Sequence, residues 1–487
     1  MSQSNWVSKL REAAPKSNFL RGTSILVVGN IIAQSLVLLS SPLLTRIYSP
    51  AEFGLLAVFG ATTAIAGSIV CGRYEAAVAL PDTERETVSV IAGAILVAAI
   101  MAPLTSLLFL ATPWATLLID EGYSIAFILV TVTLGTILAG LCATYRYWGI
   151  KQKNYTLIAR SRILQSITRV VTQCGFFFGG ATTLILGTLA AALVGFVTLH
   201  RGVQKPVRSS GAEILTAINR YRRFPLYSTW STALNMGGKQ LPIFAFVTLF
   251  GVGPAGLYSL AERVIAAPVS LVTSAFSAMF LSESVTSKQN RTLTALVGQT
   301  HKLLTNIAIA PFLMLAITAP ALFPMLFGEK WAEAGTIASW ISLYLYLSFV
   351  AAPMTMLFRT LERQDVELKI QCSLFAGRLV AVFLGAKLGG FIFSVAFYSI
   401  VSAIYYIYIL AWVSNSVDLD PMILIRQTCN SLGWALLTTS PCIFTFIYQT
   451  GLADLIIGIV LAIFFMTVRF FAIQKNIHID SKHAPKT

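Results

Sequence analysis

Long apolar runs with few charges recur along the whole sequence, each about 18 to 25 residues long, the length that crosses a bilayer as a helix. The composition agrees, because 56% of the 487 residues are hydrophobic and only 11% are charged, well below the usual share in soluble proteins. Lipid cannot hydrogen-bond the backbone, and the runs lack the alternation of barrel strands. We therefore expect an all-α integral membrane protein.

The runs predict about fourteen transmembrane helices. We place them at 24–45, 53–71, 87–111, 123–145, 157–178, 182–200, 226–250, 255–281, 303–327, 334–358, 366–385, 389–412, 424–447 and 452–473. The first run is too long for the core of a signal peptide and precedes no small-residue cleavage site, so we expect it to be retained. An even number of helices places both termini on one side of the membrane.

The distribution of Lys and Arg gives this arrangement an orientation. With the N-terminus in the cytoplasm, the inward segments carry 28 of the 35 Lys and Arg residues, and the outward loops carry three. This bias follows the positive-inside rule and predicts that both termini are cytoplasmic. It also explains the net charge of +15 without a nucleic-acid partner, since no soluble basic domain is present to bind one.

A tight corner occurs twice in the sequence. Ser49 to Glu52 form a capping-box pattern with a proline at the first helical position, which predicts a short outward turn that starts a helix. The segments "SPAEFGLLA" (49–57) and "GPAGLYSLA" (253–261) match at an offset of 204 residues, and Asn30 and Asn235 lie at nearly the same offset. We infer two parallel copies of a six-helix unit with a substrate site between them.

This repeat predicts two pseudo-symmetric six-helix bundles around a central cavity, followed by two C-terminal helices. The expected parts are a cytoplasmic tail (1–23), an N-lobe of helices 1–6 (24–200), a cytoplasmic amphipathic linker (201–225), a C-lobe of helices 7–12 (226–412), helices 13–14 (413–473) and a cytoplasmic tail (474–487). Within the linker, "AINRYRRFP" is typical of an interfacial helix on anionic lipid; guidance of a lipid diphosphate into the cavity is the alternative.

Polar side chains follow helical spacings within several spans, which predicts a polar lining of the cavity. The amide-bearing candidates are Asn30, Gln34, Gln165, Gln173 and Asn235. For the Ser and Thr residues on the same stripes, hydrogen bonding between helices is the simpler interpretation.

Charges within the membrane need a partner or water, because each costs about 2.5 to 3.5 kcal/mol at the centre of a span. The predicted cationic cavity is lined by Arg46, Arg169, Lys239, Arg263 and Arg378. Only one clear intramembrane anion, Glu262, is available to pair with them. The alternative is snorkelling near helix ends, with Arg46 as a simple turn residue. A cationic cavity predicts an anionic substrate, and a phosphate or diphosphate head suits Lys and Arg.

Glu262 is also a candidate for gating or for coupling to an ion gradient, as are Arg73 and Glu75 at the inner end of the second span. These two side chains could form a gate latch. They could equally belong to a solvated cytoplasmic loop that ends in a Thr83–Glu86 helix cap.

Residues 221–283 read "YRRFPLYSTWSTALNMGGKQLPIFAFVTLFGVGPAGLYSLAERVIAAPVSLVTSAFSAMFLSE". The order of F-P-L-Y-S, Q-L-P and G-L-Y-S-L-A-x-R-V in this block resembles the polysaccharide-transporter, or Wzx-like oligosaccharide flippase, family of the MOP superfamily. In the first half, "LTRIYSPAEFGLLAVF" and "RYEAAVALPD" are similar to N-terminal motifs of the same family.

The resemblance implies a flippase of the bacterial inner membrane. It would move undecaprenyl-diphosphate-linked oligosaccharide from the cytoplasmic to the periplasmic leaflet by alternating access, for O-antigen, capsule or exopolysaccharide biosynthesis. It implies no enzymatic activity and no cofactor, with a proton or sodium gradient as the driving force to consider. Its partners would be membrane lipids, a polysaccharide polymerase and chain-length machinery. Arg46, the Arg73–Glu75 group and Arg263 fall in family motifs, whereas Lys239 has no family counterpart.

Three other functions remain to be weighed. A peptidoglycan-precursor lipid flippase obeys the same physics, and a multidrug or toxin antiporter of the same superfamily would favour intramembrane carboxylates over cations. A membrane polymerase or glycosyltransferase would need a large polar outward loop or a carboxylate pair for a metal, and neither is seen inside the spans. The six cysteines show no spacing typical of a disulfide framework or a metal site.

Overall fold

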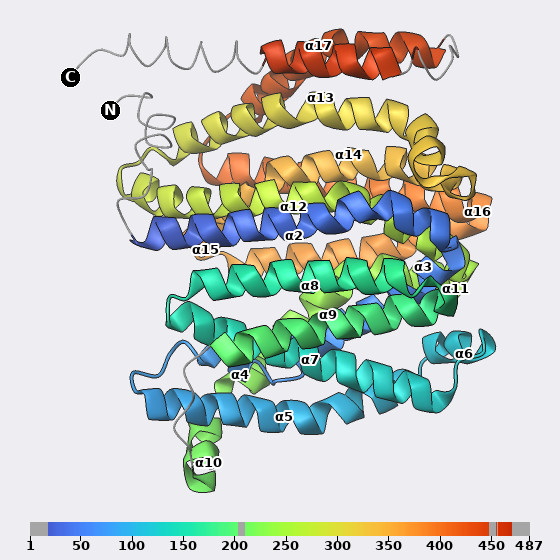
Figure 1. The fold of residues 1–487 in the computed structure, drawn as a ribbon. Helices are drawn as coiled ribbons and strands as arrows, with labels where there is room; N and C mark the ends of the chain where they lie inside the picture. The colour runs from blue at the N-terminus through green and yellow to red at the C-terminus, as the bar shows by residue number, and fades with distance from the viewer. Residues whose placement is uncertain (1–17, 203–209, 448–453, 455, 470–487) are drawn as a thin grey trace. The chain divides into compact units, whose positions relative to one another are not determined.

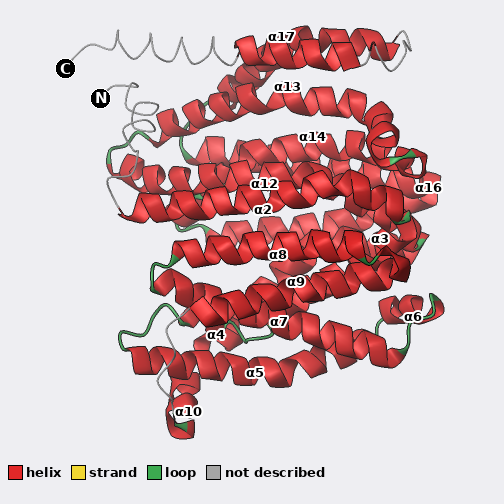
Figure 2. Ribbon diagram, viewed as in Figure 1, coloured by secondary structure: helices red, strands yellow, loops and turns green. Residues whose placement is uncertain are grey.

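The computed structural model describes residues 18–202, 210–447, 454 and 456–469, and in this part of the chain all regular secondary structure is helical (Figures 1 and 2). The main helices are α2 (Asn18–Ile47), α3 (Pro50–Ile69), α4 (Tyr74–Ala77), α5 (Glu84–Leu110), α6 (Pro113–Asp120), α7 (Ile125–Lys151), α8 (Tyr155–Gly175), α9 (Gly180–Gly202), α10 (Gly211–Arg220), α11 (Thr229–Phe250), α12 (Val252–Gln289), α13 (Leu293–Phe327), α14 (Ala332–Met354), α15 (Leu357–Thr360), α16 (Gln364–Ser416) and α17 (Pro421–Ile447). The predicted all-α class is confirmed.

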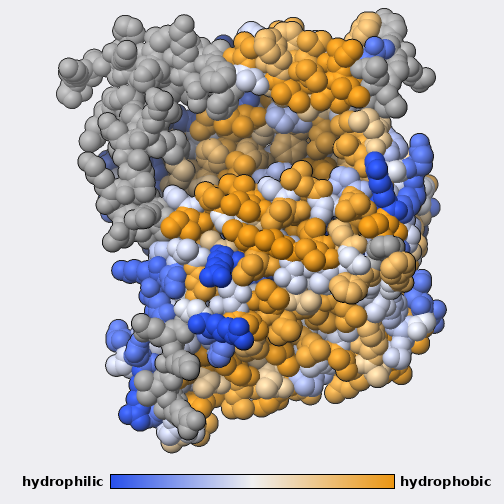
Figure 3. Space-filling view, in the orientation of Figure 1, coloured by the Kyte–Doolittle hydropathy of each residue, from blue (hydrophilic) through white to orange (hydrophobic). Residues whose placement is uncertain are grey.

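Nine helical segments among the described residues are long and apolar enough to cross a bilayer, so the chain is a multi-pass membrane protein. They are Ser24–Ile47, Pro50–Ile69, Glu84–Leu110, Ile125–Lys151, Gly180–Gly202, Val252–Gln289, Leu293–Phe327, Glu329–Thr360 and Gln364–Ser416. Figure 3 shows apolar side chains spread over the surface. Leu39 and Leu388, for example, are 78% and 68% exposed, as expected of side chains that would face lipid.

The count of fourteen transmembrane helices stays a prediction. Three of the expected spans are helices that are too polar to be recognised as spans by apolarity alone. Helices α8, α11 and α17 lie at expected positions without reaching the apolar threshold, α8 because of its three arginines and α11 because of Asn235, Lys239 and Gln240. Helix α16 joins two expected spans across a kink at Gly389 and Gly390. Gly390 has φ of 81°, a conformation that only glycine adopts without strain.

The chain forms two compact units, and the first covers Gly22–Leu260. Within it α8 packs along α9, α5 and α9 pack on α7, and α3 packs on both α7 and α11. Helix α11, expected in the C-lobe, thus belongs by its packing to the first unit; the lobe boundaries proposed from the sequence remain a prediction. The second unit continues from Ala261, with α13 packed on α14 and α17 and α14 packed on α16.

The repeated corner forms as expected at its first copy. The Ser49 amide donates to the Glu52 carboxylate over 2.6 Å, and the Glu52 amide donates to Ser49 Oγ over 3.3 Å, which completes a capping box at the start of α3. The start of α12, which carries the second copy, lies directly against it. A Cβ on Gly54 would be 1.8 Å from the Val252 carbonyl oxygen, and a Cβ on Gly256 would be 1.8 Å from that of Pro50. The two related corners therefore approach backbone to backbone.

Candidate functional site

Three arginines gather on α7 and α8 in the first unit. Arg162 lies within electrostatic range of both Arg146 and Arg169, and no described residue accepts a hydrogen bond from the buried Arg169 Nε. Among the described residues no carboxylate forms an ion pair with any of the three. Glu75 lies within electrostatic range of Arg146, but no described carboxylate pairs with Arg162 or Arg169. Positive charge is therefore in excess here, and an anion is the natural complement.

The sequence of α8 explains how these arginines are presented. Asn154 caps the helix by accepting a hydrogen bond from the Leu157 amide over 3.2 Å. Arg162, Gln165, Arg169 and Gln173 then follow at steps of three and four residues, which places them on one stripe. The helix is held against α9 by close approaches at glycines, among them Gly195.

The two glutamines of this stripe are used in packing. The Gln165 amide donates to Ser161 Oγ over 3.1 Å, and Ser161 donates in turn to the Gly195 carbonyl oxygen over 3.1 Å. The buried side-chain amide of Gln173 donates to the Leu184 carbonyl oxygen over 2.9 Å, and the Gln173 backbone carbonyl oxygen accepts from the Tyr48 hydroxyl over 2.7 Å. These contacts fix α8 and leave the arginines as the free polar groups of the stripe.

A second arrangement surrounds Arg378 in the second unit. This side chain is only 9% exposed, and its Nε donates to Ser402 Oγ over 2.9 Å. Its guanidinium carbon lies 4.9 Å from the ring centre of Tyr398 and 6.0 Å from that of Tyr344, which is cation–π geometry. Glu262 of α12 lies within electrostatic range of Arg378, so two of the predicted site residues come together here.

The Arg73–Glu75 ion pair lies at the start of α4, between α3 and α5 in the first unit. Arg73 Nη1 and Glu75 Oε1 are 3.1 Å apart, and Arg73 Nε donates to Ser228 Oγ on the segment before α11 over 3.4 Å. The Glu75 side chain is 6% exposed, and its Oε2 accepts no hydrogen bond from any described residue. Burial therefore raises the pKa of Glu75, although Arg73 acts in the opposite direction. The Thr83–Glu86 helix cap of the alternative also forms, since the Glu86 amide donates to Thr83 Oγ1 over 3.3 Å, and the role of the Arg73–Glu75 pair as a latch stays a prediction.

The other predicted site residues lie on more open surfaces. Arg46 ends α2 and is exposed, as are Asn30 on α2 and both Asn235 and Lys239 on α11. Gln34 on α2 is partly buried, and its Oε1 has no hydrogen-bond partner. Arg263 follows Glu262 on α12 and is partly buried. Their roles as substrate ligands or cavity lining stay predictions.

Some of the neighbouring residues could not be placed from the sequence. The apolar run at 123–145 ends before Arg146, which predicts an inward loop there, whereas α7 continues to Lys151. Tyr344 and Tyr398 carry no sequence signal, since each looks like an ordinary aromatic residue of an apolar span.

The family described as "Polysaccharide biosynthesis protein" matches residues 43–336, more than half of the chain. The chain belongs to this family. The chain is also similar to the "Succinoglycan biosynthesis transport protein ExoT" of Rhizobium meliloti (strain 1021), with 28% identity over 314 residues. That match covers 62% of this chain and 61% of the relative's length.

Two solved structures have folds similar to that of this chain. The lipid II flippase MurJ in an inward closed conformation has a TM-score of 0.69 at 13% identity, with 92% of this chain and 99% of that chain covered. An inward-facing MATE-family multidrug resistance transporter of the MOP superfamily has a TM-score of 0.55 at 13% identity, with 80% and 94% covered. The chain thus has a MOP-type transporter fold, as the resemblance implied.

Proposed function

We propose that this protein is a flippase of the bacterial inner membrane, with both termini in the cytoplasm, that moves a polyprenyl-diphosphate-linked oligosaccharide to the periplasmic leaflet by alternating access. Membership of the polysaccharide biosynthesis family and the transporter fold support this proposal. The similarity to a succinoglycan transport protein favours exopolysaccharide among the surface polymers. We infer no covalent chemistry, because moving the lipid between leaflets requires none.

The observation that carries the proposal is the arginine cluster of α7 and α8. A lipid-linked sugar has one strongly charged part, its diphosphate, and guanidinium groups bind phosphate oxygens through paired hydrogen bonds. Arg162 and Arg169 lie two helical turns apart on the same stripe, so a diphosphate could exchange one arginine for the other as it moves. An organic cation would be repelled by the same cluster, which argues against drug antiport.

The membrane potential favours the proposed direction of transport. In an inside-negative membrane, each negative charge carried outward gains about 2.3 kcal/mol per 100 mV. The Arg73–Glu75 latch is suited to gate the cytoplasmic end, because its buried carboxylate and its link to Ser228 join α4 to the segment that leads into α11. A proton or sodium gradient could add to this driving force.

A peptidoglycan-precursor lipid flippase is the second candidate, favoured by the fold similarity to MurJ. The two functions share the anionic lipid carrier and differ in the sugar. They are separated by genetics, because loss of a peptidoglycan-precursor flippase stops growth, whereas loss of an exopolysaccharide flippase removes a surface polymer.

The test is deletion of the gene in its bacterium, followed by complementation with Arg162→Gln and Arg169→Gln. We expect deletion to abolish the surface polymer and to leave its lipid-linked intermediate on the cytoplasmic leaflet of membrane vesicles. Each variant should slow transport about tenfold or more, because one charge-assisted contact to phosphate is lost. Arg160→Gln on the exposed face of α8 is the matched control and should restore normal polymer. Normal polymer in the deletion strain would refute the proposal.

A further inference from the structure

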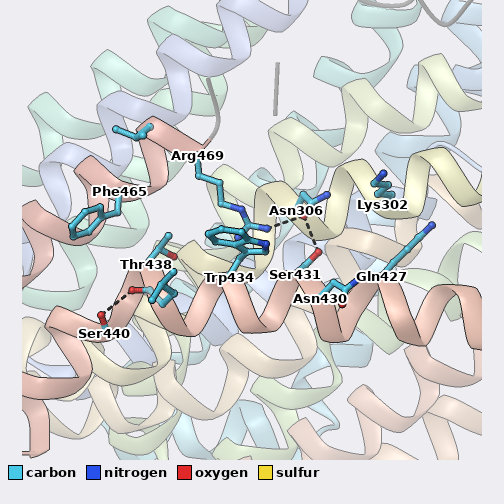
Figure 4. Close-up of a pocket in the computed structure, with 12 residues that line it drawn as sticks. Lys302, Asn306, Gln427, Asn430, Ser431, Trp434, Thr438, Ser440, Phe465 and Arg469 are labelled. Atoms are coloured by element: carbon cyan, nitrogen blue, oxygen red, sulfur yellow. Dashed lines mark hydrogen bonds between the residues drawn. The ribbon is translucent and has the colours of Figure 1, made fainter. Parts of the chain in front are cut away.

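A cavity of about 710 Å³ opens in the second unit between α13, α17 and the C-terminal helical segment Ile456–Arg469 (Figure 4). We call it the C-terminal cavity. Its lining residues are Lys302, Asn306, Gln427, Asn430, Ser431, Trp434, Leu437, Thr438, Ser440, Phe465, Val468 and Arg469. Its volume lies within the usual range for sites that hold small molecules. None of these residues belongs to the arginine cluster or to the latch.

One end of the C-terminal cavity is built from hydrogen-bond donors. Asn306 Oδ1 already accepts from Ser431 Oγ over 2.8 Å and from Arg469 Nη2 over 2.9 Å, as the dashed lines in Figure 4 show. The Asn306 amide nitrogen is therefore left to donate. Gln427 Oε1 faces His301 Nδ1 at 2.8 Å, which leaves the Gln427 amide nitrogen to donate as well.

Among the described residues of the lining, the charged ones at this end are two cations, Lys302 and Arg469. In the same part of the chain, no residue accepts a hydrogen bond from the buried Arg469 Nη1. The Arg469 guanidinium carbon lies 5.8 Å from the ring centre of Trp434, which helps to hold the side chain in place. A buried guanidinium nitrogen without an acceptor is costly, and a phosphate oxygen would satisfy it.

The rest of the lining is mainly apolar, with Leu437, Phe465 and Val468 on α17 and the C-terminal segment. The same two helices expose further large apolar side chains, including Phe444 and Val460. The C-terminal cavity thus combines a cationic donor end with an apolar wall on helices that border bulk lipid. This is the chemistry of a bound anionic amphiphile.

The charged end also lies at the right depth, if the orientation proposed above holds. Lys302 ends an expected inward segment, Gln427 follows one, and Arg469 lies at the inner end of the last expected span. Three segments far apart in the sequence therefore place their polar groups near the cytoplasmic surface, where anionic headgroups are found.

We propose that the C-terminal cavity binds an anionic glycerophospholipid of the cytoplasmic leaflet, with its phosphate between Lys302 and Arg469 and an acyl chain along Trp434, Leu437 and Phe465. This lipid is not cargo. It joins α17 and the C-terminal segment to α13, and it does so whichever sugar the protein transports.

The experiment is native mass spectrometry of the full-length protein, delipidated in detergent and then supplied with dioleoyl phosphatidylglycerol, dioleoyl phosphatidylcholine or undecaprenyl phosphate. We expect selective retention of phosphatidylglycerol over phosphatidylcholine. Lys302→Gln with Arg469→Gln should lower that retention about tenfold or more. Asn306→Asp is a second variant, expected to fold normally because its carboxylate would pair with Arg469 and exclude the phosphate. Lys387→Gln, an exposed cation remote in sequence, is the control.

Equal retention of phosphatidylglycerol and phosphatidylcholine would overturn the proposal, as would unchanged selectivity in both variants. Stronger retention of undecaprenyl phosphate, lost in the same variants, would also overturn it and assign the cavity to the carrier lipid. Transport assays are not used here, so failure of the flippase proposal leaves this test intact.

Discussion

Replacement of Gly256 by alanine tests the close approach of α3 and α12. The added Cβ would lie 1.8 Å from the Pro50 carbonyl oxygen and 2.8 Å from the Gly54 amide nitrogen, and both atoms are backbone. Neither can rotate away as a side chain would. Ordinary contact requires the helices to separate by roughly 1.5 Å, which loosens the packing around the whole crossing.

The expected cost follows from two opposing effects. Overpacking of a rigid contact costs about 1 to 3 kcal/mol, and the cost here lies at the upper end because the atoms that the new Cβ meets are backbone. The higher helix propensity of alanine offsets up to about 1 kcal/mol of this cost. The net loss is about 2 kcal/mol, which corresponds to a fall in apparent melting temperature of about 4 to 8 °C.

Gly253→Ala provides the matched control on the same helix, because a Cβ there meets nothing within 4 Å. The assay is the apparent melting temperature of both purified variants in one detergent at one heating rate, since membrane proteins unfold irreversibly. If Gly256→Ala melts together with Gly253→Ala, the two corners do not approach as closely as described and the packing argument fails.

Two further predictions concern the first unit. Because the pKa of Glu75 is raised in the folded protein, the free energy of unfolding should fall as the pH rises from about 4 through the raised pKa. Glu75→Gln should flatten this pH dependence of the melting temperature; an unchanged dependence would contradict the burial of this carboxyl group. Arg220 and Glu86 form an ion pair over 2.7 Å, but the arginine is 63% exposed, so Arg220→Ala should lower the free energy of unfolding by less than about 1 kcal/mol. A large drop in melting temperature would instead show that this ion pair holds α10 in place.

Much of the fold could be predicted from the sequence because the bilayer imposes a simple rule. The apolar runs at 24–45 and 87–111 became α2 and α5, since a chain in lipid has few alternatives to a helix. The corner at Ser49 was predictable for the same local reason, because a capping box needs only residues within one turn. Boundaries were less predictable where a helix continues past its apolar run, as α7 does to Lys151.

The candidate site was predictable in its chemistry but not in its contacts. Arg169 and Arg378 both stood out as charges within apolar spans, yet their surroundings differ. Arg378 is enclosed by Tyr344, Tyr398 and Ser402, whereas Arg169 has a buried nitrogen without a partner. Such differences arise from side chains that are distant in the sequence, and no local pattern encodes them.

This difference separates the two arginines in function as well. An arginine stacked on aromatic rings and hydrogen-bonded to a serine has much of its desolvation compensated by the protein, so its charge is stabilised without a ligand. In the cluster, Arg146 has Glu75 within electrostatic range, whereas Arg162 and Arg169 form no ion pair among the described residues, and repulsion from the neighbouring arginines adds to the cost at Arg162. Binding of a diphosphate would remove both penalties at once, while its departure would restore them. The cluster should therefore stay hydrated between transport cycles, and a variant that supplies a carboxylate beside Arg169 should stabilise the protein while slowing transport.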